Sequence, residues 1–438
     1  MDDHHSPKPS RSGASKPSRL ACLGLDALNF TLADVRDGLG PYLAIYLIAT
    51  RGPDGGWNEA TTGLVMTIAG VARIVAQTPA GALIDRTRFK RSIVIAGAIA
   101  VTLSCLALPW ISNIYLVAAT QSVAHIAGAI FPPALAAITL GIVGPKAFSK
   151  RIGRNEGFNH AGNATAAAIA AVTAYMFGPV VVFWLMAALA ILSVGASLLI
   201  PADEIDHDLA RGLDCDEGQD REQPSGLAVL LTNKLLLLFA TLCVLFHLSN
   251  AAMLTTVGQL LTHVAGKEHA TSQTAICIVA AQCVMVPVAI LVGRNADDIG
   301  RKPIFLCAFA VLAVRGVLYT FSESPADLMS VQALDGIGAG VYGALFPIVV
   351  ADLTRGSGRF NVAQGAVATA QGTGASLSAT LAGLVIVSVG YGAAFLTLAG
   401  IAAVGFVLYA VAMPETRPDS ADLDAANPGP RDLAPSAT

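Results

Sequence analysis

The residues of this sequence that could do chemistry are charged and polar side chains that interrupt long apolar runs. The first run, residues 22–49, contains Asp26, Asp34, Arg36 and Asp37. A charge at the centre of a lipid bilayer costs about 2.5–3.5 kcal/mol, so in a membrane these side chains must face protein or water. Arg73 interrupts the second run, and the rise of an α-helix puts it and Asp34 at a shared depth of roughly 16–19 Å. This spacing predicts a buried pair of Arg73 with Asp34 or Asp37.

Two chemistries are open to this pair. Burial disfavours ionisation of a carboxyl group and a nearby arginine favours it, so a carboxyl group balanced between them could take up and release a proton. Arg73 could instead contact an anionic substrate. The alternative is a permanently ionised pair that only fixes helix packing. Because the first run holds more acids than arginines, we interpret it as functional, with these candidate coupling or substrate residues: Asp26, Asp34, Arg36, Asp37 and Arg73.

Further polar residues lie inside later runs. Arg315 and Asp335, counted from opposite sides of a hydrocarbon core of about 30 Å, fall at the same depth. They could form a functional pair or one that only fixes packing. His125 and His247 could carry a proton near neutral pH, or could be hydrogen-bonded packing residues. Gln121 lies one helical turn from His125, and Asn250 follows His247 at i+3, which predicts a polar patch on each helix.

Composition indicates the elements that must position these residues. The chain has 438 residues, of which 54% are hydrophobic and 13% are charged, whereas soluble domains carry about 25% charged residues. Lipid is therefore the expected solvent. The net charge of −3 provides no basic excess for nucleic acid. The sequence has no GxxxxGK[ST] phosphate loop and no metal-ligand or nucleophile pattern, and its seven cysteines show no CxxC spacing. We expect neither an enzyme nor a cofactor.

Twelve apolar runs approach the roughly 20 residues that a membrane-spanning helix needs. Six precede residue 201 and six follow residue 226, which predicts an all-α membrane protein with twelve transmembrane helices in two pseudo-symmetric six-helix bundles, residues 21–200 and 227–414. The acidic stretch 201–226 predicts a flexible linker, and the polar ends 1–20 and 415–438 predict disordered tails. The expected spans are 22–49, 60–84, 92–111, 114–142, 156–178, 180–200, 235–262, 272–293, 303–321, 327–351, 361–388 and 391–413.

The distribution of basic residues predicts the orientation. Of the 27 Lys and Arg residues, three fall within spans, and only Arg51 and Lys267 fall in loops on the side opposite the N-terminus. Positive charge marks the cytoplasmic side of a membrane protein. The N-terminus, the linker and the C-terminus are therefore all expected to be cytoplasmic.

The two halves repeat short motifs. Phe131-Pro132-x-x-x-Ala136 recurs as Phe346-Pro347-x-x-x-Ala351, and the loop after the second span, Gly81-x-Leu83-x-Asp85-Arg86, matches the loop after the eighth, which holds Gly293, Asp297, Gly300, Arg301 and Lys302. In these paired loops the sequence resembles the major facilitator superfamily, whose signature is G-x-L-x-D-R-x-G-R-K. The resemblance extends over residues 21–414.

The resemblance implies that these loops lock the two bundles together on the cytoplasmic side. In the family the acidic residue meets the N-terminus of a helix in the other half, which here would place Asp85 near Arg359 and Asp297 near Arg154. A carboxylate is favoured at a helix N-terminus by about 0.3–1 kcal/mol. The alternative is that the loops only anchor the chain by positive charge. The implied gate residues are Gly81, Asp85, Arg86, Arg154, Gly293, Asp297, Gly300, Arg301 and Arg359.

The resemblance also implies a function. The sequence is more similar to bacterial efflux-type members than to sugar carriers, so we expect a proton-coupled transporter of the bacterial inner membrane that exports a small organic molecule by alternating access. Its partners would be the substrate, protons and the lipid bilayer, and we expect a monomer. The G-x-x-x-G-P motif of many exporters is absent from the fifth span. Uptake of an organic anion, and a sensory protein that keeps the transporter fold, remain the alternatives.

Overall fold

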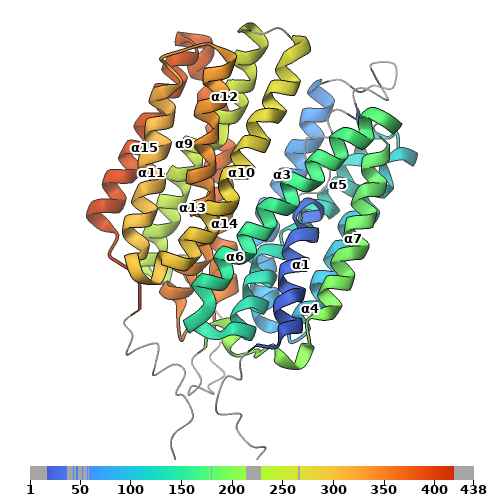
Figure 1. Cartoon of the computed structure of the whole chain (residues 1–438), viewed down its shortest axis with the longest axis vertical. Helices are drawn as coiled ribbons and strands as arrows, with labels where there is room; N and C mark the ends of the chain where they lie inside the picture. The colour runs from blue at the N-terminus through green and yellow to red at the C-terminus, as the bar shows by residue number, and fades with distance from the viewer. Residues whose placement is uncertain are drawn as a thin grey trace, which may run out of the picture.

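The computed structural model describes residues 17–36, 43, 46, 47, 52, 57, 59–178, 180–213, 228–264 and 267–418, and this part of the chain contains helices but no strand. Two groups of helices lie side by side (Figure 1). The first comprises α1 (Arg19–Arg36), α3 (Glu59–Arg86), α4 (Lys90–Leu106), α5 (Ile114–Gly128), α6 (Phe131–Phe177) and α7 (Val181–Leu199). The second comprises α8 (Ala228–Thr232), α9 (Lys234–Val264), α10 (Lys267–Ile299), α11 (Arg301–Leu318), α12 (Pro325–Ala333), α13 (Asp335–Thr354), α14 (Phe360–Val389) and α15 (Tyr391–Ala412).

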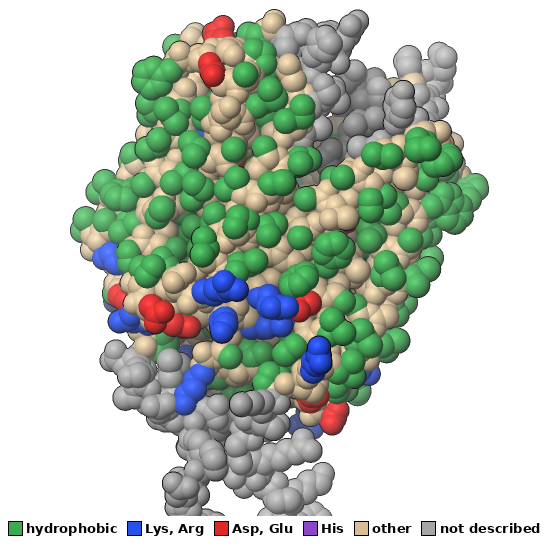
Figure 2. Space-filling view, viewed as in Figure 1, with side chains coloured by type: hydrophobic (Ala, Val, Ile, Leu, Met, Phe, Trp, Pro, Cys, Tyr) green, Lys and Arg blue, Asp and Glu red, His purple; other side chains and the backbone are tan. Residues whose placement is uncertain are grey.

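Each half has its own hydrophobic core. Residues of α1 to α7 form one cluster, and residues of α8 to α15 form the other, to which α6 of the first half adds Ala136, Leu140, Phe148 and Ile152. The outside is apolar as well. Figure 2 shows hydrophobic side chains over the middle of the molecule, while most charged side chains on this face gather towards its lower end. Two separate cores under one apolar surface are the expected construction of a two-bundle membrane protein.

Nine helical runs among the described residues are long and apolar enough to cross a membrane, judged by length and composition. One of them, residues 114–174, turns back at Gly144, whose φ of 68° is left-handed, and therefore makes two passes. The 18-residue helices α1 and α11 carry too many charges for this criterion. Counting the second pass and these two helices, the described helices agree with twelve passes.

Two elements differ from the expected spans. The loop expected between the fourth and fifth spans is a single turn, because Gly144 and Pro145 reverse the chain within α6 and helix continues on both sides. The expected span 327–351 is divided into α12 and α13 at Leu334. The second break lies directly before Asp335, which belongs to the buried polar network described below.

Residues 201–213 are folded, although the sequence predicts a flexible linker. Two short 3-10 turns, Ala202–Glu204 and Leu209–Arg211, place Ala210 in a fully buried position. The amide of Asp206 donates to the carbonyl of Gly141 at 3.0 Å, and the amide of Gly356 donates to the carbonyl of Gly212 at 2.7 Å. The apolar residues among the acids thus anchor this segment to both halves. The remaining acidic residues of the expected linker, from Asp214 onward, lie outside the described residues.

The described ends of the expected tails are also folded. Ser18 accepts a hydrogen bond from the amide of Ala21 and so caps α1, and Glu415 binds the start of α11. We call the end of the molecule where residues 200–213 and 413–418 lie the linker face; it is the lower end in Figure 1.

Candidate functional site

The helices α3 and α14 join the two halves near the linker face. Asp85, at the end of α3, accepts hydrogen bonds from the amides of Asn361 at 3.2 Å and Val362 at 2.8 Å. Arg359, the residue before α14, provides no side-chain cap, so Asp85 of the other half supplies it. This is the contact expected for Asp85. A side chain at Gly81 would collide with the backbone of Asn361, so the two helices approach to backbone contact.

The helices α6 and α10 form the second contact between the halves. A Cβ atom on Gly153 would lie 2.5 Å from the Cα of Gly293, so neither position has room for a side chain. Between α3 and α14, the hydroxyl groups of Thr78 and Thr369 are 2.9 Å apart. Small residues that allow backbones to touch are typical of helix interfaces in membranes. The interface on the linker face therefore combines close backbone contacts with a pair of buried rings, Phe148 of α6 against Phe360 of α14, whose centroids are 5.8 Å apart.

Asp297 does not pair with Arg154, although it lines a pocket together with Phe148 and Ser149, near the start of the second pass of α6. Asp297 pairs with Arg301 of its own half at 2.8 Å, because the two lie one helical turn apart. Arg154 instead pairs with Asp26 at 2.7 Å, and Asp26 also receives Arg151 at 2.6 Å. Asp26 is therefore held by two arginines of its own bundle near the linker face, away from the expected coupling pair.

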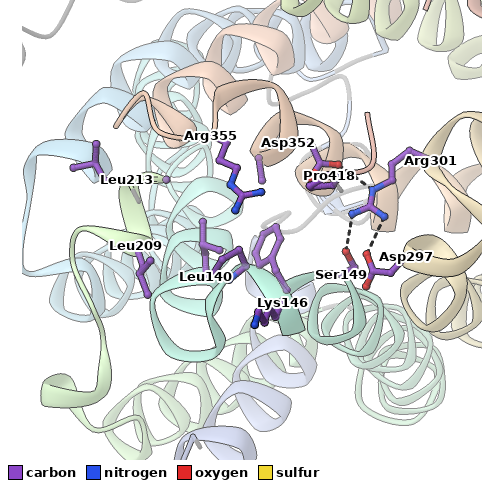
Figure 3. A pocket seen from close by; sticks show the side chains of 14 residues that line it. Leu140, Lys146, Ser149, Leu209, Leu213, Asp297, Arg301, Asp352, Arg355 and Pro418 are labelled. Carbon is purple, nitrogen blue, oxygen red and sulfur yellow. Dashed lines mark hydrogen bonds and ion pairs between the residues drawn. The ribbon is translucent and has the colours of Figure 1, made fainter. Parts of the chain in front are cut away.

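Arg301 makes the connection between the halves that was assigned to Asp297. Its guanidinium pairs with Asp352 at 2.9 Å and donates to the hydroxyl of Ser149, on α6, at 3.3 Å. Figure 3 shows Arg301 joined by dashed lines to Ser149 and Asp297, which lie side by side at the edge of a pocket on the linker face. Both halves, the folded linker segment and the C-terminal segment line this pocket; its members include Leu140, Lys146, Leu209, Leu213, Arg355 and Pro418.

A buried polar network occupies the second half. Arg315 is 1% exposed and pairs with Asp335, as the matching depths predict. Arg315 also donates to the side-chain oxygen of Asn250 on α9. The second carboxyl oxygen of Asp335 accepts from the amide of Gln332 at 3.2 Å, and Tyr319 donates to Gln332. The network ties α9, α11, α12 and α13 together at the break before α13.

His247 lies in an aromatic cluster. Its Nδ1 is 3.1 Å from the carbonyl oxygen of Cys243, and its ring meets Tyr342 edge-on at 4.6 Å. Phe246 stacks on Tyr342 at 4.9 Å, and the Tyr342 hydroxyl donates to Gln371 at 2.9 Å. Asn250 turns to Arg315 rather than to His247, so the polar patch expected on this helix does not form as a unit.

The other expected residues are placed as follows. Asp34, Arg36, Arg73, Arg86 and His125 each have an interaction partner, and the pairing of Arg73 with Asp34 stays a prediction. Gln121 is buried on α5, and Gly300 precedes α11 with a left-handed φ of 99°. Asp37 lies outside the described residues. Within the described ranges, no group of three or more His, Cys, Asp or Glu side chains is placed to hold a metal ion.

Two groups of residues were missed by the sequence analysis. On α6, His160 approaches both Glu156 and, across the interface, Gln282 of α10. The signal in the sequence was the i,i+4 spacing of Glu156 and His160, which is obscured by a stripe of asparagines on the same helix. Glu415 is the second case, since it caps α11 through the amides of Arg301 at 2.8 Å and Lys302 at 3.0 Å.

The electrostatics of Glu415 follow from this cap. Partial burial raises the pKa of the Glu415 carboxyl. Hydrogen bonds from backbone N–H groups, including those of Arg301 and Lys302, together lower this pKa by more than burial raises it. The pKa therefore lies below its usual value of 4.5. Because the carboxylate is the form that accepts these hydrogen bonds, the cap is strongest when Glu415 is ionised.

Two helical bundles with separate cores, an apolar surface and a shared interface define a membrane transport protein of the two-bundle class. The sequence model of the Major Facilitator Superfamily matches residues 20–297 and 266–437. An uncharacterized MFS-type transporter of Mycobacterium tuberculosis, strain H37Rv, is 55% identical over 400 residues, which are 91% of this chain and 94% of that protein. The chain therefore belongs to the Major Facilitator Superfamily.

Solved structures share the fold at low sequence identity. The human organic anion transporter MFSD10 (TETRAN) matches with a TM-score of 0.65 and 16% identity, over 89% of this chain and 98% of that one. The transporter FucP in the outward conformation matches with a TM-score of 0.66 and 15% identity, over 89% of this chain and 97% of that one.

Proposed function

We propose that this protein is a secondary active transporter that exports a small organic molecule by alternating access and couples this export to protons. The observation that carries the proposal is the close approach of two helical bundles along one shared interface. At Gly153 and Gly293 the helices touch through backbone atoms, and Thr78 meets Thr369 through one hydrogen bond. Contacts of this kind can separate without a change of side-chain packing at these points, and the ring pair across the interface, Phe148 against Phe360, would be exposed as the bundles part. Movement of one bundle against the other is what alternating access requires.

The arrangement supports a specific state of the cycle. The inter-bundle hydrogen bonds of Asp85, Thr78 and Arg301 lie towards the linker face. With the linker in the cytoplasm, as the distribution of Lys and Arg predicts, this is an arrangement closed towards the cytoplasm.

The coupling proton requires an ionisable group within the bundles. Asp34 and Asp37 remain candidates from the sequence, with Arg73 as their modulator. Asp26 is a weaker candidate than the sequence suggested, because Arg151 and Arg154 both hold it in place. Uptake of an organic anion is the second candidate function, and the half-buried Arg73 within α3 favours it, since a guanidinium there could bind a carboxylate.

A comparison of spent media tests the proposal. Small molecules are quantified outside host cells that carry the wild-type protein, Gly293→Leu, Gly383→Leu, Asp34→Asn or no protein, with membrane abundance measured in each. A side chain at Gly293 would collide with Gly153, whereas Gly383 faces open space. We expect a compound enriched outside cells with the wild type and Gly383→Leu, but not with Gly293→Leu at equal abundance.

The other outcomes are equally informative. A compound depleted outside cells with the wild type would refute export and support uptake. Equal media in all strains would contradict transport of the molecules present. A loss of enrichment with Asp34→Asn would support Asp34 as a coupling residue, and an unchanged enrichment would remove it from the candidates.

A further inference from the structure

A histidine and a carboxyl group of α6 lie where this helix meets α10 of the other bundle. The Nδ1 of His160 is 2.8 Å from the side-chain oxygen of Gln282. Its Nε2 is 4.0 Å from a carboxyl oxygen of Glu156, one helical turn below. The same oxygen of Glu156 accepts from the amide of Asn159 at 3.1 Å. The group therefore joins two ionisable side chains of one bundle to a neutral amide of the other.

The hydrogen-bond roles leave one contact, that of His160 with Glu156, at which a proton can be added. Because the oxygen of Gln282 can only accept, Nδ1 of His160 must carry the hydrogen in this bond. In a neutral imidazole Nε2 is then an acceptor, and it has no hydrogen-bond partner among the described residues. It faces the Glu156 oxygen, which is also an acceptor when ionised. A proton on either atom turns this contact between two acceptors into an attractive one.

The surroundings allow this proton to be exchanged. The side chain of His160 is 11% exposed and that of Glu156 is 22% exposed, so the carboxyl group is more accessible than the ring. The charged groups that act on His160 are Glu156 and, from α1, Arg36. From the other bundle α10 presents the uncharged Gln282, and α13 presents its backbone at Gly343 beside Glu156. When Glu156 is protonated, Arg36 is the one charge left among these groups, and it disfavours a second proton on His160.

We propose that Glu156 and His160 together hold the proton that couples transport, and that Gln282 reports the state of this pair to the other bundle. The inference rests on the proposed function. One proton enters the pair from water on one side of the membrane and returns to water on the other side. When the bundles separate at this point, His160 loses Gln282, so the affinity of the pair for the proton differs between the two arrangements. This difference is what links protonation to movement.

The mutual influence of the two groups can be measured without a substrate. The full-length protein, labelled with 15N-histidine in lipid nanodiscs, is titrated by NMR from about pH 4 to pH 9, which brackets the range of histidine. His160→Asn identifies the signal of His160. We expect this signal to titrate, and Glu156→Gln to shift its midpoint by about one pH unit or more, as strongly interacting sites do. His263→Asn, which removes an exposed imidazole of α9, should leave the midpoint unchanged.

A second measurement covers the case in which Glu156→Gln does not fold. The infrared band of the protonated Glu156 carboxyl is titrated in the wild type and in His160→Asn, and its midpoint should shift by a similar amount. A His160 signal that does not titrate in the wild type overturns the inference. Midpoints that agree within about 0.3 pH units between the wild type and Glu156→Gln also overturn it, because the groups then do not share a proton.

A transport assay separates this inference from the proposed function. For a compound found in the media comparison, Glu156→Gln in proteoliposomes should retain exchange of labelled compound and lose accumulation driven by a pH gradient. Accumulation equal to that of the wild type would refute the role of the pair while transport stands. Coupled titration in a protein that moves no compound would refute transport and the coupling role, and leave only a shared proton.

Discussion

The buried pair of Arg315 and Asp335 makes a sharp prediction. In Asp335→Ala the guanidinium of Arg315, at 1% exposure, loses its only ionic partner among the described residues. Stranding a buried charge costs about 3–5 kcal/mol. Because Asn250 still accepts from the guanidinium, we expect the lower end, about 3 kcal/mol. This corresponds to roughly a hundredfold change in the unfolding equilibrium.

Removal of both charges should restore stability. In Arg315→Met combined with Asp335→Leu no charge is left at this buried site, and such apolar replacements are often neutral or stabilising. Unfolding by sodium dodecyl sulfate in mixed micelles, followed by circular dichroism, compares both variants with the wild type. The control Asp327→Ala, at the exposed start of α12, should cost less than about 1 kcal/mol. If the single and double variants are equally stable, the ion pair does not hold Arg315 in place and the reasoning fails.

Three further predictions concern the linker face. Asp85→Ala should lower the free energy of unfolding by about 0.5–2 kcal/mol, as the loss of a helix cap does, because the amides of Asn361 and Val362 lose their acceptor. Thermal unfolding in detergent would show this loss, and an unchanged midpoint would contradict the cap. Asp26→Asn should lower the free energy of unfolding by about 3–5 kcal/mol, because the buried Arg151 loses its carboxylate partner. Unfolding in dodecyl sulfate measures this loss, and a loss below about 1 kcal/mol would be contrary evidence. Glu415→Gln should destabilise at pH 7, and its difference from the wild type should vanish as the pH falls from 4.5 through the lowered pKa of Glu415; a difference that persists at low pH would rule out an ionic cap.

Contacts fixed by helix geometry could be predicted from the sequence. Arg315 and Asp335 were paired from their depths, because the rise per residue is constant along a helix. Asp85 was placed at the start of α14 from the family resemblance, and the hydrogen bond to Val362 at 2.8 Å confirms that placement. The first case needs only the position of each residue along its helix and the side of the membrane from which that helix enters, whereas the second also needs the family resemblance.

Contacts that depend on competition between partners could not be predicted. Asp297 has Arg301 one turn away on its own chain segment, and this local partner prevails over a distant helix end. Arg154 had more than one acidic residue as a possible partner in the sequence, and in the structure it pairs with the buried Asp26. The cap of α11 by Glu415 comes from more than 110 residues away along the chain, so no local capping pattern reveals it.

The distribution of interaction strength over the molecule suits relative movement of two rigid halves. The buried ion pairs of Asp26 with Arg151 and of Arg315 with Asp335 each lie within one bundle, and disrupting such a pair costs several kcal/mol. Between the bundles the described contacts include the bond of Thr78 to Thr369, and a hydrogen bond of this type contributes about 0.5–1.5 kcal/mol. Asp85 adds charge-assisted bonds at a single point, where water can replace them once the helices part. Separation therefore breaks hydrogen bonds and the ring contact of Phe148 with Phe360, whereas each bundle keeps the buried ion pairs that define its own packing.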